Sequence, residues 1–216
     1  TQPSLFERGA AEQLTWIPAP FKLVVDTFDV RSAIASSVNT KELSGVDPAK
    51  QALRSRAGRE VMQTFMDRSA SGALRWNVCM FPTDAYAQDA EMSLADFEDF
   101  VYAACLCDKD DPVAAWREVG RRQQILVDYL KGKKEVHLVG EGTDVTVGIE
   151  GRSFVNCCGD KNMPDGEVFT GPEETKVNGH VTFSFPAVYQ GREVQGVQVW
   201  FEDGVAVRWA AEKNEA

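Results

Sequence analysis

One glutamate, Glu167, occupies a position from which a carboxylate could hold a metal ion. It follows residues 164–166 (Pro-Asp-Gly) and precedes residues 168–170 (Val-Phe-Thr). Proline fixes its own φ and glycine permits a positive φ, so Pro-Asp-Gly predicts a tight turn. The three residues after Glu167 favour an extended strand, because they are β-branched or aromatic. The backbone would then fix the direction of the carboxylate, which suits metal coordination. A solvated turn carboxylate is the alternative, and the pattern alone favours that alternative.

Two histidines and a pair of acidic residues are further side chains of ligand type. His137 and His180 both lie in predicted strands, and neither has a partner of ligand type three or four residues away on a helix. A hydrogen bond readily satisfies a half-buried imidazole, so we expect both histidines to be structural. The pair Glu173-Glu174 is interpreted as part of a solvated turn, with a role behind a metal ligand as the alternative.

Other catalytic and binding patterns have less support in the sequence. It contains no H-E-x-x-H, no G-x-S-x-G and no phosphate-binding glycine loop. Cys157 could meet His180 as nucleophile and base, but no third residue is placed to orient them. Residues 108–111 (Asp-Lys-Asp-Asp) resemble part of a calcium loop without its glycine and terminal glutamate. They are interpreted instead as the negative charge at the start of a helix.

Helix and strand signals alternate over residues 1–131. The predicted order is helical residues 1–30 broken at Pro18 and Pro20, a strand within 31–38, a helix opened by Asp47-Pro48, a strand at 74–81, a polar loop at 83–92, and helices opened by Ser93 and by Asp111. Aspartate is a good N-cap, serine three residues before an acidic residue is a weak capping box, and proline is tolerated in a first helical turn. Strand, helix and strand in this order predict a parallel βαβ unit.

From Gly132 onward the chain becomes β-prone and rich in turns. Alternating runs at 136–139 and 145–149 flank one turn, and Asp203-Gly204 between two alternating runs is a strong hairpin signal. Gln190-Gly191 predicts another tight turn. We therefore expect an α/β fold, in which a parallel βαβ layer in residues 1–131 is followed by a mostly antiparallel β segment in residues 132–216.

Composition excludes several classes of partner. Among 216 residues, 33 are acidic and 23 are basic, which gives a formal net charge of −10. A protein this acidic gains nothing from counterion release, so we expect no nucleic-acid partner. No apolar run approaches the ~20 residues that cross a bilayer, so we expect no membrane partner. Five cysteines at scattered spacings argue against a secreted disulfide framework and predict free thiols in the cytoplasm.

Residues 162–170 (Asn-Met-Pro-Asp-Gly-Glu-Val-Phe-Thr) resemble the NMPDGEVFT signature of the M29 family of metallo-aminopeptidases, the thermophilic aminopeptidase T group. Further segments occur in the order that the family has: DPVAAW at 111–116, GTDVTV at 142–147, YQGREV at 189–194, FEDG at 201–204 and AEKNE at 211–215. The resemblance is close over residues 110–216 and looser over residues 40–100.

This resemblance implies an enzyme that releases N-terminal amino acids from peptides with the help of divalent metal ions, with zinc, cobalt and magnesium as candidates. Two cations that share ligands would activate water for the hydrolysis. Glu167 is the one metal ligand of the family that can be carried over to this sequence. The other ligands follow beyond residue 216 in family members, so the implied site is incomplete and the isolated chain is expected to be inactive.

Family members are about twice as long as this chain, so the resemblance also implies an internal piece of a longer protein. Residues 1–131 would be an N-terminal domain that is incomplete at its start, and residues 132–216 would begin the catalytic domain. Family members form dimers that enclose their active sites, which implies a homodimer. A non-catalytic module that serves assembly or substrate gating is the alternative function.

Overall fold

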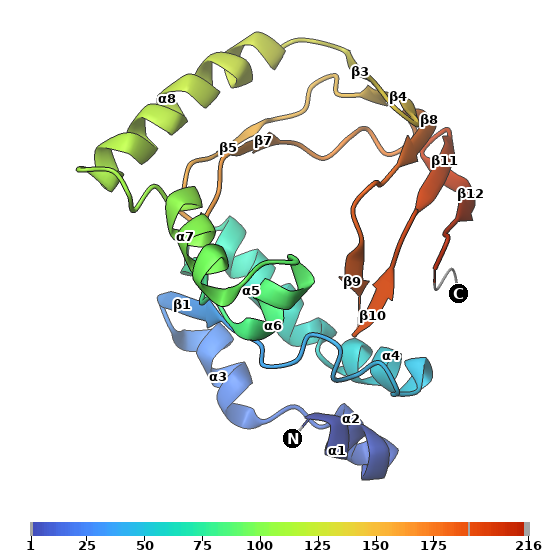
Figure 1. Ribbon diagram of the computed structural model, residues 1–216. Helices are drawn as coiled ribbons and strands as arrows, with labels where there is room; N and C mark the ends of the chain where they lie inside the picture. The colour runs from blue at the N-terminus through green and yellow to red at the C-terminus, as the bar shows by residue number, and fades with distance from the viewer. Residues whose placement is uncertain (1, 190, 214–216) are drawn as a thin grey trace. The chain divides into compact units, whose positions relative to one another are not determined.

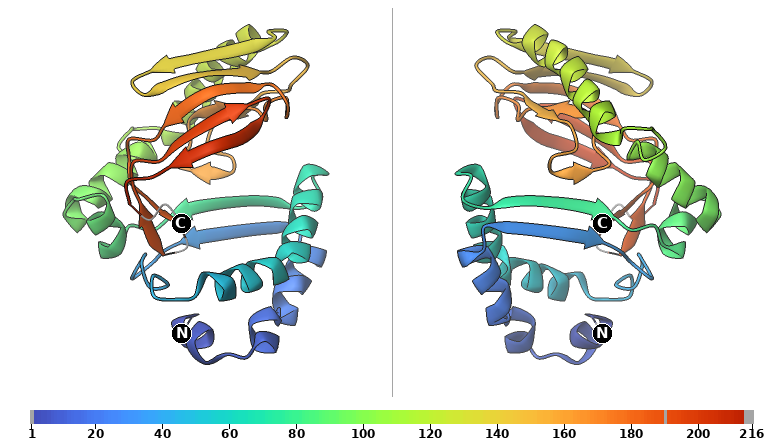
Figure 2. Two further views of the ribbon diagram at one scale, coloured as in Figure 1. Left: turned by 90° about the vertical axis from the view of Figure 1, so that its right-hand side faces the viewer. Right: turned by 90° about the vertical axis from the view of Figure 1, so that its left-hand side faces the viewer.

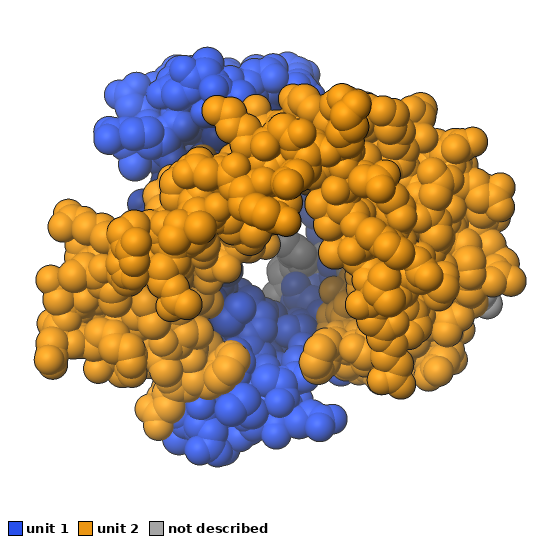
Figure 3. Space-filling model, turned by 90° about the horizontal axis from the view of Figure 1, so that it is seen from above, with its two compact units in different colours: residues 1–97 blue, residues 98–216 orange. Residues whose placement is uncertain are grey.

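The computed structural model describes residues 2–189 and 191–213 (Figure 1). The chain divides into two compact units, Thr1–Phe97 and Glu98–Ala216, which Figure 3 colours separately. The change from helices to strands lies elsewhere, between the end of α8 at Leu130 and the start of β3 at Glu135. That change is where the sequence puts its boundary between domains, and the assignment of residues 132–216 to a catalytic domain stays a prediction.

The first unit is built on a parallel pair of strands. Its elements are α1 (Gln2–Arg8), α2 (Ala11–Thr15), α3 (Ala19–Thr27), β1 (Val30–Ala35), α4 (Pro48–Ala57), α5 (Arg59–Ala70), β2 (Arg75–Met80) and α6 (Asp84–Asp89), and α7 (Leu94–Ala104) starts within it. The strands β1 and β2 pair in parallel, with Val30 opposite Arg75 and Ala35 opposite Met80 (Figure 2). The helices α4 and α5 connect the two strands, so the predicted βαβ unit is confirmed.

The predicted helix start at Asp47 is present and is stabilised by an N-cap hydrogen bond. Asp47 Oδ1 accepts a hydrogen bond from the Ala49 N–H at 2.8 Å, as expected of an N-cap before Pro48. The helix predicted after it is interrupted at Gly58, between α4 and α5, because glycine is a poor helix former. Phe65 on α5 nevertheless packs in the core, in a buried cluster with Val25 and Leu74.

Two expectations for this unit were wrong. Residues 83–92 were expected to form a polar loop, but residues Asp84–Asp89 form α6. The Thr83 side chain accepts a hydrogen bond from the Tyr86 N–H, and Ala85 and Ala87 of this helix are buried. A capping threonine and two alanines therefore outweigh the polar character of the segment. Pro20 does not break a helix either, because it lies in the first turn of α3, where proline is tolerated.

The second unit joins two helical segments to an antiparallel sheet. Its elements after α7 are α8 (Pro112–Leu130), β3 (Glu135–Gly140), β4 (Thr143–Gly148), β5 (Val155–Cys157), β6 (Asn162–Met163), β7 (Glu167–Phe169), β8 (Val177–Thr182), β9 (Ala187–Tyr189), β10 (Arg192–Val194), β11 (Gln198–Glu202) and β12 (Val205–Ala210). Five of these strands form an antiparallel sheet in the order β12-β11-β8-β4-β3. The predicted α/β fold, with a parallel part followed by an antiparallel part, is confirmed.

The hairpin at Asp203-Gly204 and the helix starts at Ser93 and Asp111 agree with the sequence. Asp203 and Gly204 connect β11 to β12 and both have positive φ, as a tight hairpin turn requires. Ser93 Oγ accepts a hydrogen bond from the Asp96 N–H at the start of α7, and Asp111 Oδ1 accepts one from the Ala114 N–H at the start of α8. The predicted turn at Gln190-Gly191 includes a residue outside the described ranges, and β9 and β10 pair on either side of it.

Among the helices of the described ranges, none combines the length and the apolar character that a membrane crossing requires.

Candidate metal centre

Glu167 opens β7, directly after the predicted turn. Gly166 has a φ of +121°, a conformation that favours glycine. Asp165, beside it, accepts a hydrogen bond from the Gly159 N–H to Oδ2 at 3.0 Å, which ties the two ends of the loop together. The Glu167 side chain is exposed. The chain bends at Pro164 and then extends with an accessible carboxylate, as expected, but Asp165 and Gly166 do not form the predicted tight turn.

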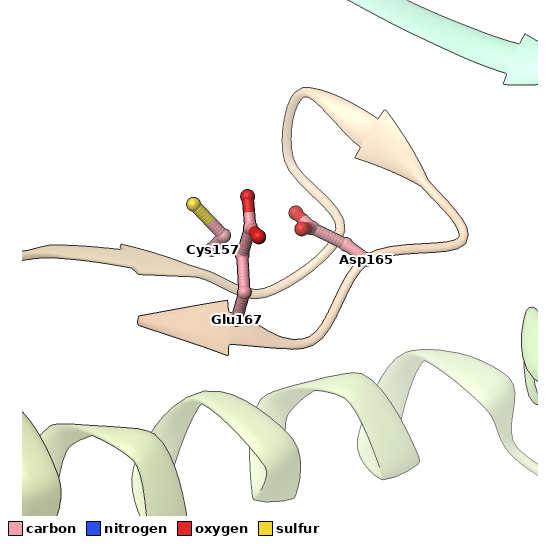
Figure 4. A group of neighbouring side chains, drawn as sticks. All are labelled: Cys157, Asp165 and Glu167. Atoms are coloured by element: carbon pink, nitrogen blue, oxygen red, sulfur yellow. The ribbon is translucent and has the colours of Figure 1, made fainter. Parts of the chain in front are cut away.

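The strand opposite β7 brings a second side chain to Glu167. Strands β5 and β7 pair antiparallel with Cys157 directly opposite Glu167. Directly opposite residues of an antiparallel pair project their side chains to the same face, a few ångströms apart. Figure 4 shows Cys157 and Glu167 on one side of the hairpin, with Asp165 pointing toward them. The register of this short strand pair therefore places a thiol beside the carboxylate.

Cys157, Asp165 and Glu167 form a cluster of ligand atoms. The Cys157 Sγ and one carboxylate oxygen of each acid all lie within 4.8 Å of one another. Within the described residues, no other group of three side chains of ligand type is this close. A thiol and two carboxylates are donors that divalent transition metals accept. The cluster therefore fits a metal ion, and we call it the Cys157 cluster.

More acidic than basic side chains surround the Cys157 thiol. Burial raises the pKa of the Cys157 thiol, and the negative charges of Asp165, Glu167 and Asp160 raise it further. A buried thiol among carboxylates keeps its proton because a further negative charge there would be repelled. A bound divalent cation would invert this balance, since its charge favours the thiolate. The local electrostatics thus suit a cation.

One glutamine of α8 holds the backbone of the cluster in place. Gln123 Nε2 donates to Asn156 Oδ1 at 2.9 Å, to the Cys157 carbonyl oxygen at 2.9 Å and to the Glu167 carbonyl oxygen at 3.1 Å. Asn156 Nδ2 in turn donates to the Gly120 carbonyl oxygen at 2.8 Å. The hairpin of β5 and β7 is therefore fastened to α8 at the two residues that carry the thiol and the carboxylate.

We expect Gln123→Ala to loosen this hairpin. Three carbonyl or amide oxygens lose their donor, so the free energy of unfolding should fall by about 1–3 kcal/mol. Metal affinity should fall roughly 10–100-fold, the usual result of removing a residue that orients a ligand. Thermal unfolding and metal titration of the chain measure the two effects. Arg122→Ala, on the same helix and exposed, is the control, and equal behaviour of the two variants would contradict the role of Gln123.

The other residues of ligand type serve the fold. His137 Nε2 lies 2.8 Å from Asp144 Oδ1, and the His180 ring stacks on Trp200 with centroids 6.4 Å apart. Both histidines lie in strands, β3 and β8, as predicted. The described residues show no hydrogen bond between Cys157 and His180. A nucleophile and base formed by these two residues therefore gains no support.

Glu174 lies in an exposed turn, as expected, and both Glu173 and Glu174 form ion pairs. Glu173 lies 2.9 Å from Lys176 Nζ, and Glu174 lies 2.6 Å from an Arg152 guanidinium nitrogen. The hydrogen bond from Lys176 lowers the pKa of Glu173. These contacts fasten the connection between β7 and β8, so the two acids have a structural part. Asp111 caps α8 and Asp108 pairs with Lys109, as expected for charges at a helix start.

A cavity of about 430 Å³ lies against the loop that leads out of β5. Val113 and Trp116 of α8 and Met163 supply its apolar wall, and Asp160 supplies a carboxylate. Cys158 and Gly159, which line it as well, directly follow Cys157 in the chain. An apolar cavity and a cluster of metal-ligand type therefore share one loop of the second unit.

The sequence predicts Glu167 as a metal ligand, but it does not predict Asp165 and Cys157 as its neighbours. Asp165 and Glu167 alternate around Gly166, which is a weak sign that two carboxylates share a face of the turn. Nothing in the sequence shows that Cys157, ten residues earlier, pairs with Glu167. That pairing depends on the register of two three-residue strands, for which the local sequence carries little information.

Comparison with known proteins finds curated relatives of this chain. The chain is 30% identical over 193 residues to Aminopeptidase 2 of Geobacillus stearothermophilus, covering 82% of this chain and 47% of the relative. It is 29% identical over 226 residues to Aminopeptidase T of Thermus thermophilus, covering 97% of this chain and 55% of the relative. The chain therefore spans about half the length of the curated relatives that it matches.

A solved structure has the same fold. Wild-type AmpT from Thermus thermophilus superposes with a TM-score of 0.79 at 25% sequence identity, over 99% of this chain and 57% of that one. The family model described as thermophilic metalloprotease (M29) matches residues 2–216, which is nearly the whole sequence. The chain therefore belongs to the M29 family of thermophilic metalloproteases.

Proposed function

We propose that this chain is part of a metal-dependent aminopeptidase, with Glu167 as a metal ligand. The observation that carries the proposal is the Cys157 cluster, in which the Glu167 carboxylate lies within 4.8 Å of the other two ligand atoms. Membership of a metalloprotease family and similarity to proteins named aminopeptidases support it. A divalent cation supplies Lewis-acid polarisation of the scissile carbonyl and a more acidic water.

The residues of this chain would supply one side of that site. Glu167 and Asp165 would contribute anionic oxygen, and Gln123 would keep the Glu167 backbone in place. Two cations per site, with zinc, cobalt or magnesium as the metal, are part of the proposal. The remaining ligands would come from sequence beyond residue 216. A cytoplasmic homodimer that encloses its active sites is the proposed assembly.

The surroundings of the Cys157 cluster suit the N-terminus of a peptide. The carboxylate of Asp160 borders a cavity whose wall includes Val113, Trp116 and Met163. A peptide substrate presents an α-ammonium group next to its first side chain. The Asp160 carboxylate would attract the ammonium, and the apolar wall would take an apolar side chain. Arg117 is the one cationic residue among the described residues of the lining. This complementarity supports peptides as the substrate class.

We expect the isolated chain to show no aminopeptidase activity, because its three candidate donors all come from one hairpin and its loop. Release of p-nitroaniline from aminoacyl-p-nitroanilides, with zinc, cobalt or magnesium added, tests this. The full-length protein should turn these substrates over, lose the activity to a chelator and regain it with metal. Turnover by residues 1–216 alone would contradict the incomplete site. A full-length protein that stays inactive with all three metals would contradict the proposed function.

One observation favours the alternative of an assembly or gating module. The helix α8 has no buried residue, and its Ile125, Leu126 and Tyr129 side chains are exposed although they are apolar. Apolar side chains gathered on one helix are typical of a surface that another part of a protein covers. The reading frame after residue 216 separates the two functions, because an enzyme should supply histidine and glutamate ligands there.

A further inference from the structure

We infer that Cys157 is itself a metal ligand, and that its thiolate makes this site select zinc or cobalt over magnesium. The inference rests on the proposed metal site at Glu167 and specifies which cation that site takes. Family resemblance assigned Glu167 alone, and the structure adds the sulfur.

The geometry of the hairpin aims the thiol at the carboxylates. Cys157 and Glu167 are directly opposite each other on β5 and β7, so their side chains leave the strand pair on the same face. In a tetrahedral zinc site, a sulfur at about 2.3 Å and an oxygen at about 2.1 Å from the metal are roughly 3.6 Å apart. The three ligand atoms already lie within 4.8 Å of one another. Small side-chain rotations would therefore bring them around one ion.

The surroundings of the thiol suit a cation. Cys157 is 9% exposed, and among the described residues its thiol has no hydrogen-bond partner. Two carboxylates, Asp165 and Glu167, each place an oxygen within 4.8 Å of the sulfur. A small packing residue, which is the usual role of a buried cysteine, would need no such neighbours. A divalent cation would compensate both carboxylates and bind the sulfur.

Hydrogen bonds hold the backbone around the three ligands. Gln123 Nε2 binds the carbonyl oxygens of both Cys157 and Glu167, and the Gly159 N–H binds Asp165 Oδ2. Ligands that are oriented by such hydrogen bonds hold a metal more tightly than free ones. The hairpin thus has the features of a prepared site.

The sulfur decides the class of metal. Magnesium prefers six oxygen ligands and keeps several waters, whereas thiolates favour zinc and similar transition metals. Of the three metals named for the proposed function, zinc and cobalt accept a Cys157 thiolate and magnesium does not. Selection between them would therefore reside in this one residue of the hairpin.

Cobalt gives a direct readout on the chain itself. The metal-free chain is titrated with an excess of cobalt(II), and the near-ultraviolet absorption of thiolate-to-cobalt charge transfer is recorded. We expect this band in the unaltered chain and its loss in Cys157→Ser, whose side chain is nearly the same size. Cys107→Ser, which alters an exposed cysteine, should keep the band. Circular dichroism melting confirms that both variants fold, and Cys157→Ala serves as a second test of the same position.

Competition experiments measure the selectivity. The apparent affinity of the chain for zinc should fall at least about tenfold in Cys157→Ser, while its affinity for magnesium stays the same. Absence of the band in the unaltered chain, or a band that survives Cys157→Ser, would overturn the inference. An active full-length metalloenzyme without the band would refute only the sulfur ligand. A band in a full-length protein without peptidase activity would refute only the proposed function.

Discussion

Glu167→Gln in the full-length protein is expected to lower kcat/KM by at least about 10–100-fold and to leave the melting temperature nearly unchanged. Even the removal of residues that only orient metal ligands lowers metal affinity or activity by this factor. Glutamine keeps the shape of the side chain but loses the negative charge that holds a divalent cation. Because the Glu167 side chain is exposed, the change should cost under about 0.5 kcal/mol of stability.

The matched control for this variant is Glu135→Gln. Glu135 is also an exposed glutamate at the first position of a strand, β3, so the two substitutions change charge and shape in the same way. Metal content, kcat/KM and melting temperature are measured for both proteins. Near-normal activity of Glu167→Gln with full metal occupancy would remove Glu167 from the site. Equal losses in both variants would indicate a general effect of charge.

The second large effect is expected from Gly204→Ala in the hairpin of β11 and β12. Gly204 has a φ of +82°, and a Cβ atom there would overlap the carbonyl group of Glu174. The left-handed conformation costs a residue with a side chain about 1–2 kcal/mol. Forcing an atom into an occupied place costs about 1–3 kcal/mol more. The free energy of unfolding should therefore fall by about 2–5 kcal/mol.

Gly132→Ala separates the two contributions. Gly132 has nearly the same φ, +78°, but nothing lies within 4 Å of a Cβ atom placed there. The free energy of unfolding of Gly132→Ala should therefore fall only by the cost of the left-handed conformation, about 1–2 kcal/mol. Urea unfolding of the two variants gives the difference. If Gly204→Ala were no less stable than Gly132→Ala, the close approach of the β11–β12 hairpin to Glu174 would be wrong.

The sequence predicted the elements whose signals are local. Asp47, Ser93 and Asp111 mark helix starts, because the capping residue and the helix it caps are neighbours in the chain. The Asp203-Gly204 hairpin was predicted for the same reason, since the turn type follows from two adjacent residues. The parallel pairing of β1 with β2 followed from the order of strand, helix and strand.

Features that depend on contacts between residues far apart in the sequence could not be predicted from local sequence patterns. The short helix α6 was mistaken for a loop because burial of Ala85 and Ala87 decides its conformation. The proximity of Cys157 to Glu167 depends on the register of β5 against β7. Hydrogen bonds from Gln123 of α8 help to fix this register. Glu167 was named from a resemblance, and its role as a metal ligand remains a prediction.

The most direct test of that role is anomalous diffraction at the zinc edge from crystals of the full-length, zinc-loaded protein. The proposed site predicts an anomalous peak about 2.0–2.2 Å from a carboxylate oxygen of Glu167. An active, fully zinc-loaded protein whose anomalous peaks all lie beyond bonding distance of Glu167 would contradict the site.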